Sequence, residues 1–355
     1  MTTVRIESTR PSGTPAPDGA LVDRFGRVAT DLRVSLTDLC SLRCTYCMPA
    51  EGLDWLSRAQ RLTDDEFVRL VRLFVRLGVT SVRLTGGEPL VHPTLPSVVE
   101  RLSSLTPRPE LSLTTNGVTL ASHAQALAAS GLDRINVSVD TLDRERFREL
   151  TRRDRLPAVL EGVAAARDAG LGPVKINAVL VRGGNLHEAP KLLAWALEAG
   201  YRLRFIEHMP LDADHTWSRT DMVTADEILT LLTDAGYTVR PHGERGTAPA
   251  EEFDVTDGPG SSGWAEPVGR LGIIASVTRP FCRDCDRLRL TADGQLRTCL
   301  FAQSETDLRG PLRAGASDHD LAELIRTAVA GKQAGHGIGE SGFTQPDRSM
   351  SAIGG

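Results

Sequence analysis

The six cysteines of this 355-residue chain fall into two widely separated groups of three. The first group is Cys40, Cys44 and Cys47, and the second is Cys282, Cys285 and Cys299. Pairing within a group of three leaves one thiol over, and six cysteines are too few for a disulfide-built fold of this length. The pattern therefore favours two metal or iron–sulfur sites over a disulfide framework.

The remaining composition excludes several classes of protein. Hydrophobic residues make up 41% and charged residues 25%, as in ordinary globular proteins, and the net charge of -5 does not indicate a nucleic-acid-binding surface. The N-terminal residues lack the apolar run of a secretory signal, and no stretch approaches the roughly 18 apolar residues of a membrane span. We therefore expect a cytoplasmic protein with no membrane or nucleic-acid partner, in which residues 1–22 form a disordered tail.

Between residues 32 and 207, six short β-like runs alternate with amphipathic helical runs. The β-like runs occupy residues 32–37, 80–85, 110–115, 134–140, 174–181 and 201–207. Helices are expected between them, for example at 64–77 and 121–129. Six βα repeats in succession imply parallel strands joined by right-handed crossovers. We therefore predict a partial (β/α)6 TIM-like barrel over residues 23–223.

The alternation breaks after residue 207. Beyond it we expect a capped helix at 224–234, short strands at 271–277, 288–291 and 296–300, and a final helix at 320–330. Residues 247–264 are rich in Gly, Pro and Ser and are expected to form an excursion. Residues 224–330 are accordingly predicted to form an α+β C-terminal domain that carries the second cysteine group. Residues 331–355 are expected to form a Gly-rich, irregular tail.

The predicted barrel strands alternate between apolar and polar residues, although strands buried on both faces are normally apolar throughout. Helices must cover the apolar faces, so the polar side chains should line the interior and require a polar ligand. The interior positions carry one carboxylate, Asp140. They also carry five cations, which are Arg33, Arg83, Lys175, Arg202 and Arg204. This excess predicts a polyanionic ligand such as a triphosphate.

Two simpler explanations of the polar faces remain open. An open antiparallel sheet would also expose one polar face to water, but the βα alternation argues against it. Internal ion pairs with Glu88, Asp140 or Glu207 could neutralise part of the positive charge, but not all five cations.

The first cysteine group has the spacing CxxxCxxC and directly follows the first predicted strand, at the strand end where barrel active sites lie. Three thiolates on a short loop can hold three corners of a [4Fe–4S] cluster and leave one iron open to a substrate, whereas structural zinc usually takes four ligands. With Tyr46 before the last cysteine, the motif resembles that of the radical S-adenosylmethionine superfamily. The resemblance implies that the open iron binds S-adenosylmethionine, that its reductive cleavage gives a 5′-deoxyadenosyl radical, and that Tyr46 lies near the adenine.

Other strand ends are similar to the cofactor-binding segments of that superfamily. Gly86, Gly87 and Glu88 follow the second strand and resemble the segment that binds the methionyl amino group. Ser138, at the end of the fourth strand, resembles a ribose or carboxylate contact. Met209, after the sixth strand, resembles an adenine contact, although a lone methionine is more often a core residue.

The second group has the spacing CxxC, then thirteen residues, then Cys299. The intervening Ala292-Asp293-Gly294 is a hairpin turn signal that should return Cys299 beside the CxxC pair. A zinc site would need a fourth ligand, which His319 or His336 could supply. Together, the two groups resemble the GTP 3′,8-cyclase (MoaA) family of molybdenum cofactor biosynthesis, with a match that runs from about residue 31 to the last residue. This resemblance implies a second [4Fe–4S] cluster with one iron open to the guanine base.

The family resemblance implies a set of further site residues. Those expected to hold GTP, mainly by its triphosphate, are Arg33, Arg83, Thr114, Lys175, Arg204, Arg287, Leu288 and Arg289. Arg287 and Arg289 lie two apart on a strand and share one face, and they are also expected to be catalytic, like the first cysteine group. Gly354 and Gly355, ordinarily a disordered end, match a terminal Gly-Gly that reaches into the active site and is needed for activity. One departure is residues 91–92, Val-His, where relatives often carry basic residues.

The reaction implied by the resemblance converts GTP to (8S)-3′,8-cyclo-7,8-dihydroguanosine 5′-triphosphate, after the adenosyl radical removes the C3′ hydrogen. The implied partners are a low-potential electron donor of the flavodoxin or ferredoxin type, a cyclic pyranopterin monophosphate synthase that uses the product, and a second copy of the chain in a homodimer. Three alternatives remain open: a peptide-modifying radical enzyme with an auxiliary cluster, a two-cluster electron carrier, and a zinc-stabilised binding protein.

Overall fold

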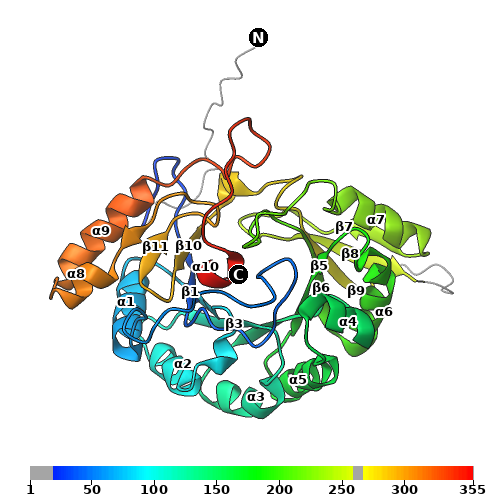
Figure 1. Ribbon diagram of the computed structural model, residues 1–355, viewed down its shortest axis with the longest axis horizontal. Coiled ribbons are helices and arrows are strands. Elements are labelled where there is room, and N and C mark those ends of the chain that lie inside the picture. The colour runs from blue at the N-terminus through cyan, green and yellow to red at the C-terminus, as the bar shows by residue number, and fades with distance from the viewer. Residues whose placement is uncertain (1–18, 259–266, 355) are drawn as a thin grey trace, which may run out of the picture.

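A computed structural model describes residues 19–258 and 267–354 of the chain. Its strands form one curved sheet in the order β12-β11-β10-β1-β2-β3-β4-β5-β6-β9-β8-β7 (Figure 1). Most of the expected N-terminal tail lies outside the described residues. Within that expected tail, however, Leu21 is buried in the core, so packing begins before residue 22, where we expected the tail to end.

The centre of the sheet is the predicted run of six parallel strands. These are β1 (Asp31–Ser35), β2 (Ser81–Thr85), β3 (Glu110–Thr115), β4 (Arg134–Ser138), β5 (Lys175–Leu180) and β6 (Arg202–Glu207). Each pairs in parallel with the next, so the six βα units and the barrel-like fold class are confirmed.

Two strands from the C-terminal part of the chain lengthen this parallel run. β10 (Arg287–Leu290) pairs in parallel with β1, and β9 (Gly269–Ile274) pairs in parallel with β6. Antiparallel strands complete both edges, with β11 (Gln295–Arg297) and β12 (Thr306–Asp307) beyond β10, and β8 (Glu251–Asp257) and β7 (Thr238–Pro241) beyond β9. The α+β extension thus continues the barrel sheet instead of forming a sheet of its own.

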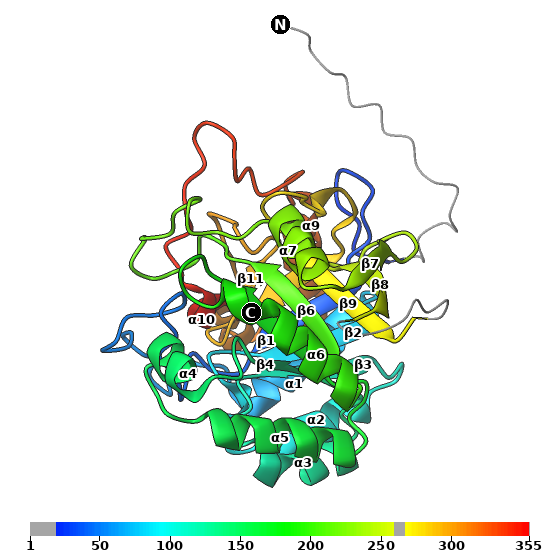
Figure 2. The same ribbon diagram turned by 90° about the vertical axis from the view of Figure 1, so that its right-hand side faces the viewer.

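Helices cover the outer face of the curved sheet. Those of the barrel are α1 (Asp64–Arg76), α2 (Leu95–Ser103), α3 (Leu120–Ala129), α4 (Arg144–Thr151), α5 (Leu156–Asp168) and α6 (Ala189–Ala199). α7 (Ala225–Asp234), α8 (Arg309–Arg313) and α9 (Asp318–Ala330) belong to the extension. Figure 1 and Figure 2 show α3 and α5 side by side on the outside.

The alternation of the strands sorts side chains between the two faces, as expected. In β1, Leu32 and Val34 are fully buried in the apolar core, whereas Arg33 and Ser35 face the interior of the barrel. The core therefore lies between sheet and helices, and the concave face of the sheet is left for polar chemistry.

The C-terminal part is more regular than its composition indicated. Within the segment expected to be an excursion, residues 251–257 form β8, because Phe253 and Val255 alternate into the core. Residues 259–266 lie outside the described part. The tail is also not wholly irregular, because α10 (Met350–Ile353) forms near its end. Figure 1 shows this helix at the centre of the ring of strands.

Among the helices of residues 19–258 and 267–354, none combines the length and the apolar character that crossing a bilayer requires.

The N-terminus of α1 gives a test of the fold. Thr63 and Glu66 form a capping box, in which the Thr63 hydroxyl accepts from the Glu66 N–H at 3.2 Å and the Glu66 carboxylate accepts from the Thr63 N–H at 2.8 Å. Thr63→Ala should lower the free energy of unfolding by about 0.5–2 kcal/mol, because it removes one acceptor for the helix N–H groups. The urea midpoint of unfolding, at an unchanged slope, measures this loss.

Thr119→Ala is the matched control, since Thr119 also begins a helix and is exposed but makes no side-chain capping bond. It should change stability by less than about 0.5 kcal/mol. Equal losses in the two variants would contradict the capping argument.

Candidate active site

Both cysteine groups open onto one cavity of about 310 Å³ at the carboxyl ends of the parallel strands. This is the face on which barrel enzymes place their active sites, and the volume suits a small-molecule ligand. The predicted site residues on its wall are Arg33, Cys40, Cys44, Tyr46, Cys47, Arg83, Gly86, Gly87, Thr114, Ser138, Arg204, Met209, Cys282, Cys285, Arg287, Arg289 and Cys299. Glu88, Lys175, Leu288 and Gly354 do not line the cavity, and Gly355 lies outside the described residues.

The first cysteine group sits on the loop between β1 and α1. The loop turns because the Cys44 carbonyl accepts from the N–H groups of Cys47 and Met48, at 3.0 and 3.1 Å. Burial raises the pKa of all three thiols, and that of Cys47 rises to about 12 through burial and the neighbouring Cys40. Such thiols need a bound metal to persist as thiolates. The sequence reasoning missed Asn116, whose side-chain N–H group points at the Cys40 sulfur at 3.7 Å.

The glycines after β2 are required by packing against the cysteine loop. A Cβ on Gly86 would overlap the Thr37 carbonyl oxygen, and a Cβ on Gly87 would overlap the carbonyl oxygens of Asp38 and Leu39. The Gly87 N–H also donates to the Thr37 carbonyl at 2.7 Å. The chain therefore needs glycine here so that two backbone segments can make contact.

The Glu88 carboxylate is turned away from the cavity. It accepts hydrogen bonds from the Thr115 hydroxyl and the Asn116 N–H, both at 2.6 Å, and from the Leu90 N–H at 2.9 Å. Burial raises its pKa. Glu88 thus ties the end of β3 to the segment after β2, and Gly86 and Gly87 form the cavity wall.

Tyr46 lies across the cavity from the ends of β4 and β5. Its hydroxyl donates to Asp140 at 2.5 Å, while the other oxygen of Asp140 accepts from the Val179 N–H at 2.8 Å. Burial raises the pKa of Asp140 to about 6. His208 lies near the tyrosine ring, with ring centroids 6.2 Å apart, and both of its nitrogens are buried without a hydrogen-bond partner among the described residues.

His208 is a lining residue that the sequence reasoning missed, although it directly precedes Met209 at the end of β6. Another unpartnered atom is the side-chain oxygen of Asn177, which also lies on the cavity wall. Buried polar atoms without partners are costly, so these groups are suited to a polar ligand in the cavity.

Arginines gather in register at the floor of the cavity. Arg33 on β1 stands beside Arg83 on β2 and beside Arg289 on β10. Burial, followed by the charge of Arg83, lowers the pKa of Arg33 to about 9, and burial also lowers the pKa values of Arg83 and Arg289. Within the described part of the chain, the Arg33 Nε and one terminal nitrogen of Arg287 are buried without a hydrogen-bond partner. A cluster of guanidinium groups with free donors fits a polyanion.

Internal ion pairing does not explain this cluster. The carboxylates of Asp140 and Glu88 accept the hydrogen bonds given above and do not pair with the arginines that the structure describes. Glu207 accepts from the N–H groups of Val277 and Thr278 at 2.8 and 2.9 Å. Among the residues that the structure describes, Arg33 pairs with Asp31 and Arg287 pairs with Asp286, both at a long 3.9 Å.

The remaining predicted cations divide between the cavity and its surroundings. Arg204 lines the cavity, and Gly272 on the adjacent β9 leaves it room, because a Cβ there would lie 3.0 Å from Arg204 Cγ. Arg202, expected in the interior, instead has a side chain that is 42% exposed and faces Glu252 outside the cavity. Lys175 lies beside the cluster, and burial together with the charge of Arg204 lowers its pKa to about 7.

The second cysteine group is assembled by the predicted hairpin. Cys282 and Cys285 bracket a short 3-10 turn, and antiparallel pairing of β10 with β11 brings Cys299 back to the same wall. Burial alone would raise the pKa of Cys285, but the charges of Arg287 and Lys332 outweigh it and the net shift is downward. The Lys332 ammonium donates to the Cys285 and Arg287 carbonyls at 2.8 and 2.9 Å.

Neither histidine proposed as a fourth zinc ligand is placed to act as one. His336 Nε2 bonds the Ser276 carbonyl at 2.9 Å and its Nδ1 accepts from the Ile338 N–H at 3.0 Å, so both nitrogens are occupied. His319 is exposed in the first turn of α9. Within the described residues, no three His, Cys, Asp or Glu side chains are arranged to hold a single metal ion.

Alternate residues of β10 point to opposite sides. Arg287 and Arg289 reach the cavity, whereas the Leu288 side chain is fully buried in the apolar core. The Gly354 carbonyl accepts from Arg289, and the Ile353 carbonyl accepts from the Ser35 hydroxyl at 3.0 Å. The chain end therefore reaches the arginine cluster, as expected for Gly354. Its φ of +87° and the overlap that a Cβ would have with Ser35 and Thr85 make glycine necessary there.

Comparisons with known proteins agree with this geometry. The Radical SAM superfamily model matches residues 34–196, and the Molybdenum Cofactor Synthesis C model matches residues 201–338. The GTP 3′,8-cyclase of Streptomyces coelicolor is 60% identical over 337 residues, which cover 94% of this chain and 96% of that protein. The GTP 3′,8-cyclase of Mycobacterium marinum is 56% identical, covering 95% of this chain and 93% of that protein.

A solved structure supports the fold alone. Streptococcus suis SuiB bound to the precursor peptide SuiA is similar with a TM-score of 0.58 at 15% identity, covering 92% of this chain and 76% of that one. The identity with the cyclases is far higher and spans nearly all of both chains. The chain therefore belongs to the GTP 3′,8-cyclase family and, with it, to the radical S-adenosylmethionine superfamily.

Proposed function

We propose that this protein converts GTP to (8S)-3′,8-cyclo-7,8-dihydroguanosine 5′-triphosphate, the first step of molybdenum cofactor biosynthesis. The observation that carries the proposal is the opening of two cysteine triads onto one cavity whose floor is a cluster of buried arginines. One triad suits the source of the radical, the other suits the purine base, and the arginines suit the triphosphate between them. A two-cluster electron carrier would have no need of such a floor.

The residues of the first triad fit a [4Fe–4S] cluster with one open iron, since three thiols and no fourth cysteine lie on the loop. With S-adenosylmethionine bound, that cluster supplies the electron that gives methionine and a hydrogen-abstracting 5′-deoxyadenosyl radical. The protein's own contribution is positional. Gly86, Gly87 and Ser138 line the wall on this side, and Tyr46 is fixed by Asp140.

The triphosphate is proposed to bind the arginine floor. Arg33, Arg83 and Arg289 stand side by side across three strands, so their guanidinium groups can surround a chain of phosphates, with Arg204 and Thr114 on the adjoining wall. Each charge-assisted hydrogen bond is worth about 1.5–3 kcal/mol. Binding the triphosphate on the floor would hold the ribose near the first triad and the base near the second. Holding the reacting groups in this orientation would raise the reaction rate.

We also propose that Cys282, Cys285 and Cys299 hold a second [4Fe–4S] cluster with an iron open to the guanine base. The triad again lacks a fourth cysteine, and His336, which lies on the same cavity wall, has both ring nitrogens hydrogen-bonded. Lys332 and Arg287 place positive charge beside Cys285, which favours its thiolate.

The remaining parts of the proposal rest on family membership. We propose a cytoplasmic homodimer that receives electrons from a flavodoxin- or ferredoxin-type donor and passes its product to a cyclic pyranopterin monophosphate synthase. Within one chain, α10 lies at the centre of the ring of strands and Gly354 is buried against Arg289, and both would help to exclude water from the radical chemistry.

Anaerobic reconstitution with iron and sulfide tests the two-cluster proposal. We expect about eight irons per chain, and about four when Cys282, Cys285 and Cys299 are all replaced by Ser, because each triad holds one cube. Iron and sulfide content measure this. With S-adenosylmethionine and dithionite, 5′-deoxyadenosine should form only when GTP is present.

About four irons in the unmodified protein, or bound zinc, would contradict the second cluster. Deoxyadenosine formation that requires a peptide instead of GTP would favour the peptide-modifying alternative.

Arg83→Met tests the arginine floor. Losing one charge-assisted contact should weaken GTP binding about 10- to 150-fold. Because Arg83 is buried beside Arg33, the ligand-free variant should unfold at the same or a higher temperature than the unmodified protein. Equilibrium binding and thermal unfolding measure the two effects.

Arg202→Met is the matched control, because Arg202 lies on the neighbouring part of the same sheet but outside the cavity. It should bind GTP within about twofold of the unmodified protein. A loss of iron in Arg83→Met would instead assign Arg83 a structural role.

The lowered pKa of Lys175 leads us to expect that GTP binding depends on pH. Its pKa is lowered to about 7 in the free protein, and a nearby triphosphate would raise it again, so the lysine takes up a proton when GTP binds. Affinity should be independent of this group below pH 7 and should fall as the pH rises above 7. Calorimetry at pH 8 in two buffers of different ionisation enthalpy should show proton uptake that Lys175→Met lacks.

The difference between the two proteins cancels the ionisation of GTP itself. Equal proton uptake in both would show that Lys175 is already charged or lies away from the phosphates.

A further inference from the structure

The end of the chain is stretched across the mouth of the cavity. On one side, the Gln345 side chain donates to the Asp212 carbonyl at 2.6 Å, and the Met350 N–H donates to the Leu211 carbonyl at 3.0 Å. Both acceptors lie in the segment that follows β6. On the other side, the segment reaches β10, where Arg289 donates to the Gly354 carbonyl. Because β6 and β10 stand at opposite ends of the six central strands, the chain end spans the open side of the barrel (Figure 1).

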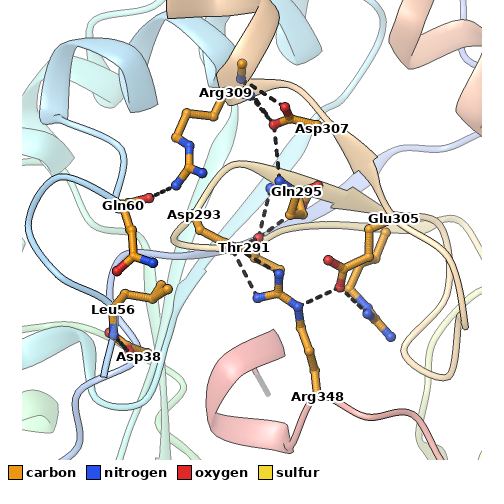
Figure 3. Close-up of polar contacts among 12 residues, drawn as sticks. Asp38, Leu56, Gln60, Thr291, Asp293, Gln295, Glu305, Asp307, Arg309 and Arg348 are labelled. Carbon is orange, nitrogen blue, oxygen red and sulfur yellow. Dashed lines mark hydrogen bonds and ion pairs between the residues drawn. The ribbon is translucent and has the colours of Figure 1, made fainter. Parts of the chain in front are cut away.

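Arg348 makes the ionic contacts of this segment. Its two terminal nitrogens donate to the two oxygens of Asp293 at 3.1 and 2.8 Å, and its Nε lies 2.8 Å from a Glu305 oxygen. Figure 3 shows the guanidinium between these two carboxylates. The arrangement is a bidentate pair with a second acid on the free edge, which fixes the direction of the side chain as well as its position.

One of the two acids, Asp293, belongs to the β10–β11 hairpin, which carries Arg287 and Arg289, and the other, Glu305, directly precedes β12 and is tied to the hairpin through Arg297. Asp293 lies in the turn between β10 and β11, where the Thr291 hydroxyl donates to it at 2.6 Å. Glu305 is also paired with Arg297 on β11, and Arg297 stands directly opposite Arg289 in the hairpin register. Arg348 therefore connects the chain end to the same hairpin that presents Arg289.

The network is better protected than an ordinary surface ion pair. The side chains of Arg348, Asp293 and Glu305 are 28%, 12% and 18% exposed, so all three are largely removed from water. Isolated exposed pairs contribute little, whereas bidentate pairs within a network are the exception. Arg348 is also not on the cavity wall, so it does not contact a ligand there.

We infer that Arg348 is a positioning residue that holds the terminal segment in register with the β10–β11 hairpin, so that Gly354 meets Arg289. The tolerance is small, since a single added methyl group at Gly354 would overlap Ser35 and Thr85. The effect of this positioning on catalysis rests on the proposed function, whereas its effect on the chain end does not.

The test uses the reconstituted full-length protein with Arg348→Ala and Arg348→Lys. Anaerobic digestion with a carboxypeptidase should release the C-terminal glycine about tenfold faster from Arg348→Ala, the factor that one charge-assisted hydrogen bond represents. GTP-dependent deoxyadenosine formation should lose about tenfold in kcat, with iron content and KM for GTP within about twofold. Arg348→Lys keeps the positive charge but cannot form the bidentate pair, so its rate of glycine release and its kcat should both be intermediate.

Arg144→Ala is the matched control. Arg144 begins the outer helix α4, and it makes a bidentate pair with Asp154 in which each contact is 2.8 Å. It should leave glycine release and kcat unchanged. Unchanged release in Arg348→Ala would overturn the inference, as would a parallel loss of iron or melting temperature with kcat, which indicates a structural role. If the unmodified protein forms no GTP-dependent deoxyadenosine, the proposed function fails, and glycine release alone decides the role of Arg348.

Discussion

The chemistry of this molecule depends on the burial of arginines that outnumber the carboxylates placed against them in the described part of the chain. Strand register places Arg33 between Arg83 and Arg289, and burial lowers the pKa of each of the three. The acids that could have neutralised them, Glu88 and Glu207, are instead bound by backbone N–H groups and hydroxyls. Cations held in this way are unfavourable until an anion arrives. Folding therefore carries the free-energy cost of burying these charges, and the binding of an anionic ligand offsets that cost.

A second constraint is the pairing of the C-terminal strands with the barrel. β10 pairs with β1 in parallel, which carries Arg289 to the side of Arg33 and the second cysteine triad to the wall that the first triad shares. β9 pairs with β6 at the other end and leaves space for Arg204 through Gly272. The chain end then crosses between these two sides. Fold and site are thus one structure, in which residues almost 320 apart along the chain, Ser35 and Ile353, meet in a hydrogen bond.

Much of the site could be read from local patterns. Alternation of polar and apolar residues identified the interior face, because a strand sends successive side chains to opposite sides. The spacing of the cysteines identified both triads. Local patterns failed where a side chain's partner lies far along the chain. Arg202 shares the face of Arg204, as the alternation requires, but it is the first residue of β6 and lies outside the cavity, 3.9 Å from Glu252 on β8, a strand that the local sequence pattern did not predict. His208 and Asn116 carry no spacing signal and emerge only from their position at strand ends.

The sequence by itself determined the chemistry, namely two thiol triads, a barrel of βα units and a cationic interior, because these depend on residue type and short-range periodicity. Tertiary structure alone decided how the parts meet. It showed that Gly86 and Gly87 are needed for backbone contact, that Glu88 is turned into the protein, and that Leu288 lies in the core between two cavity-facing arginines. It also placed Arg348 between Asp293 and Glu305. Such contacts are set by strand order and register, which are global properties that no local pattern encodes.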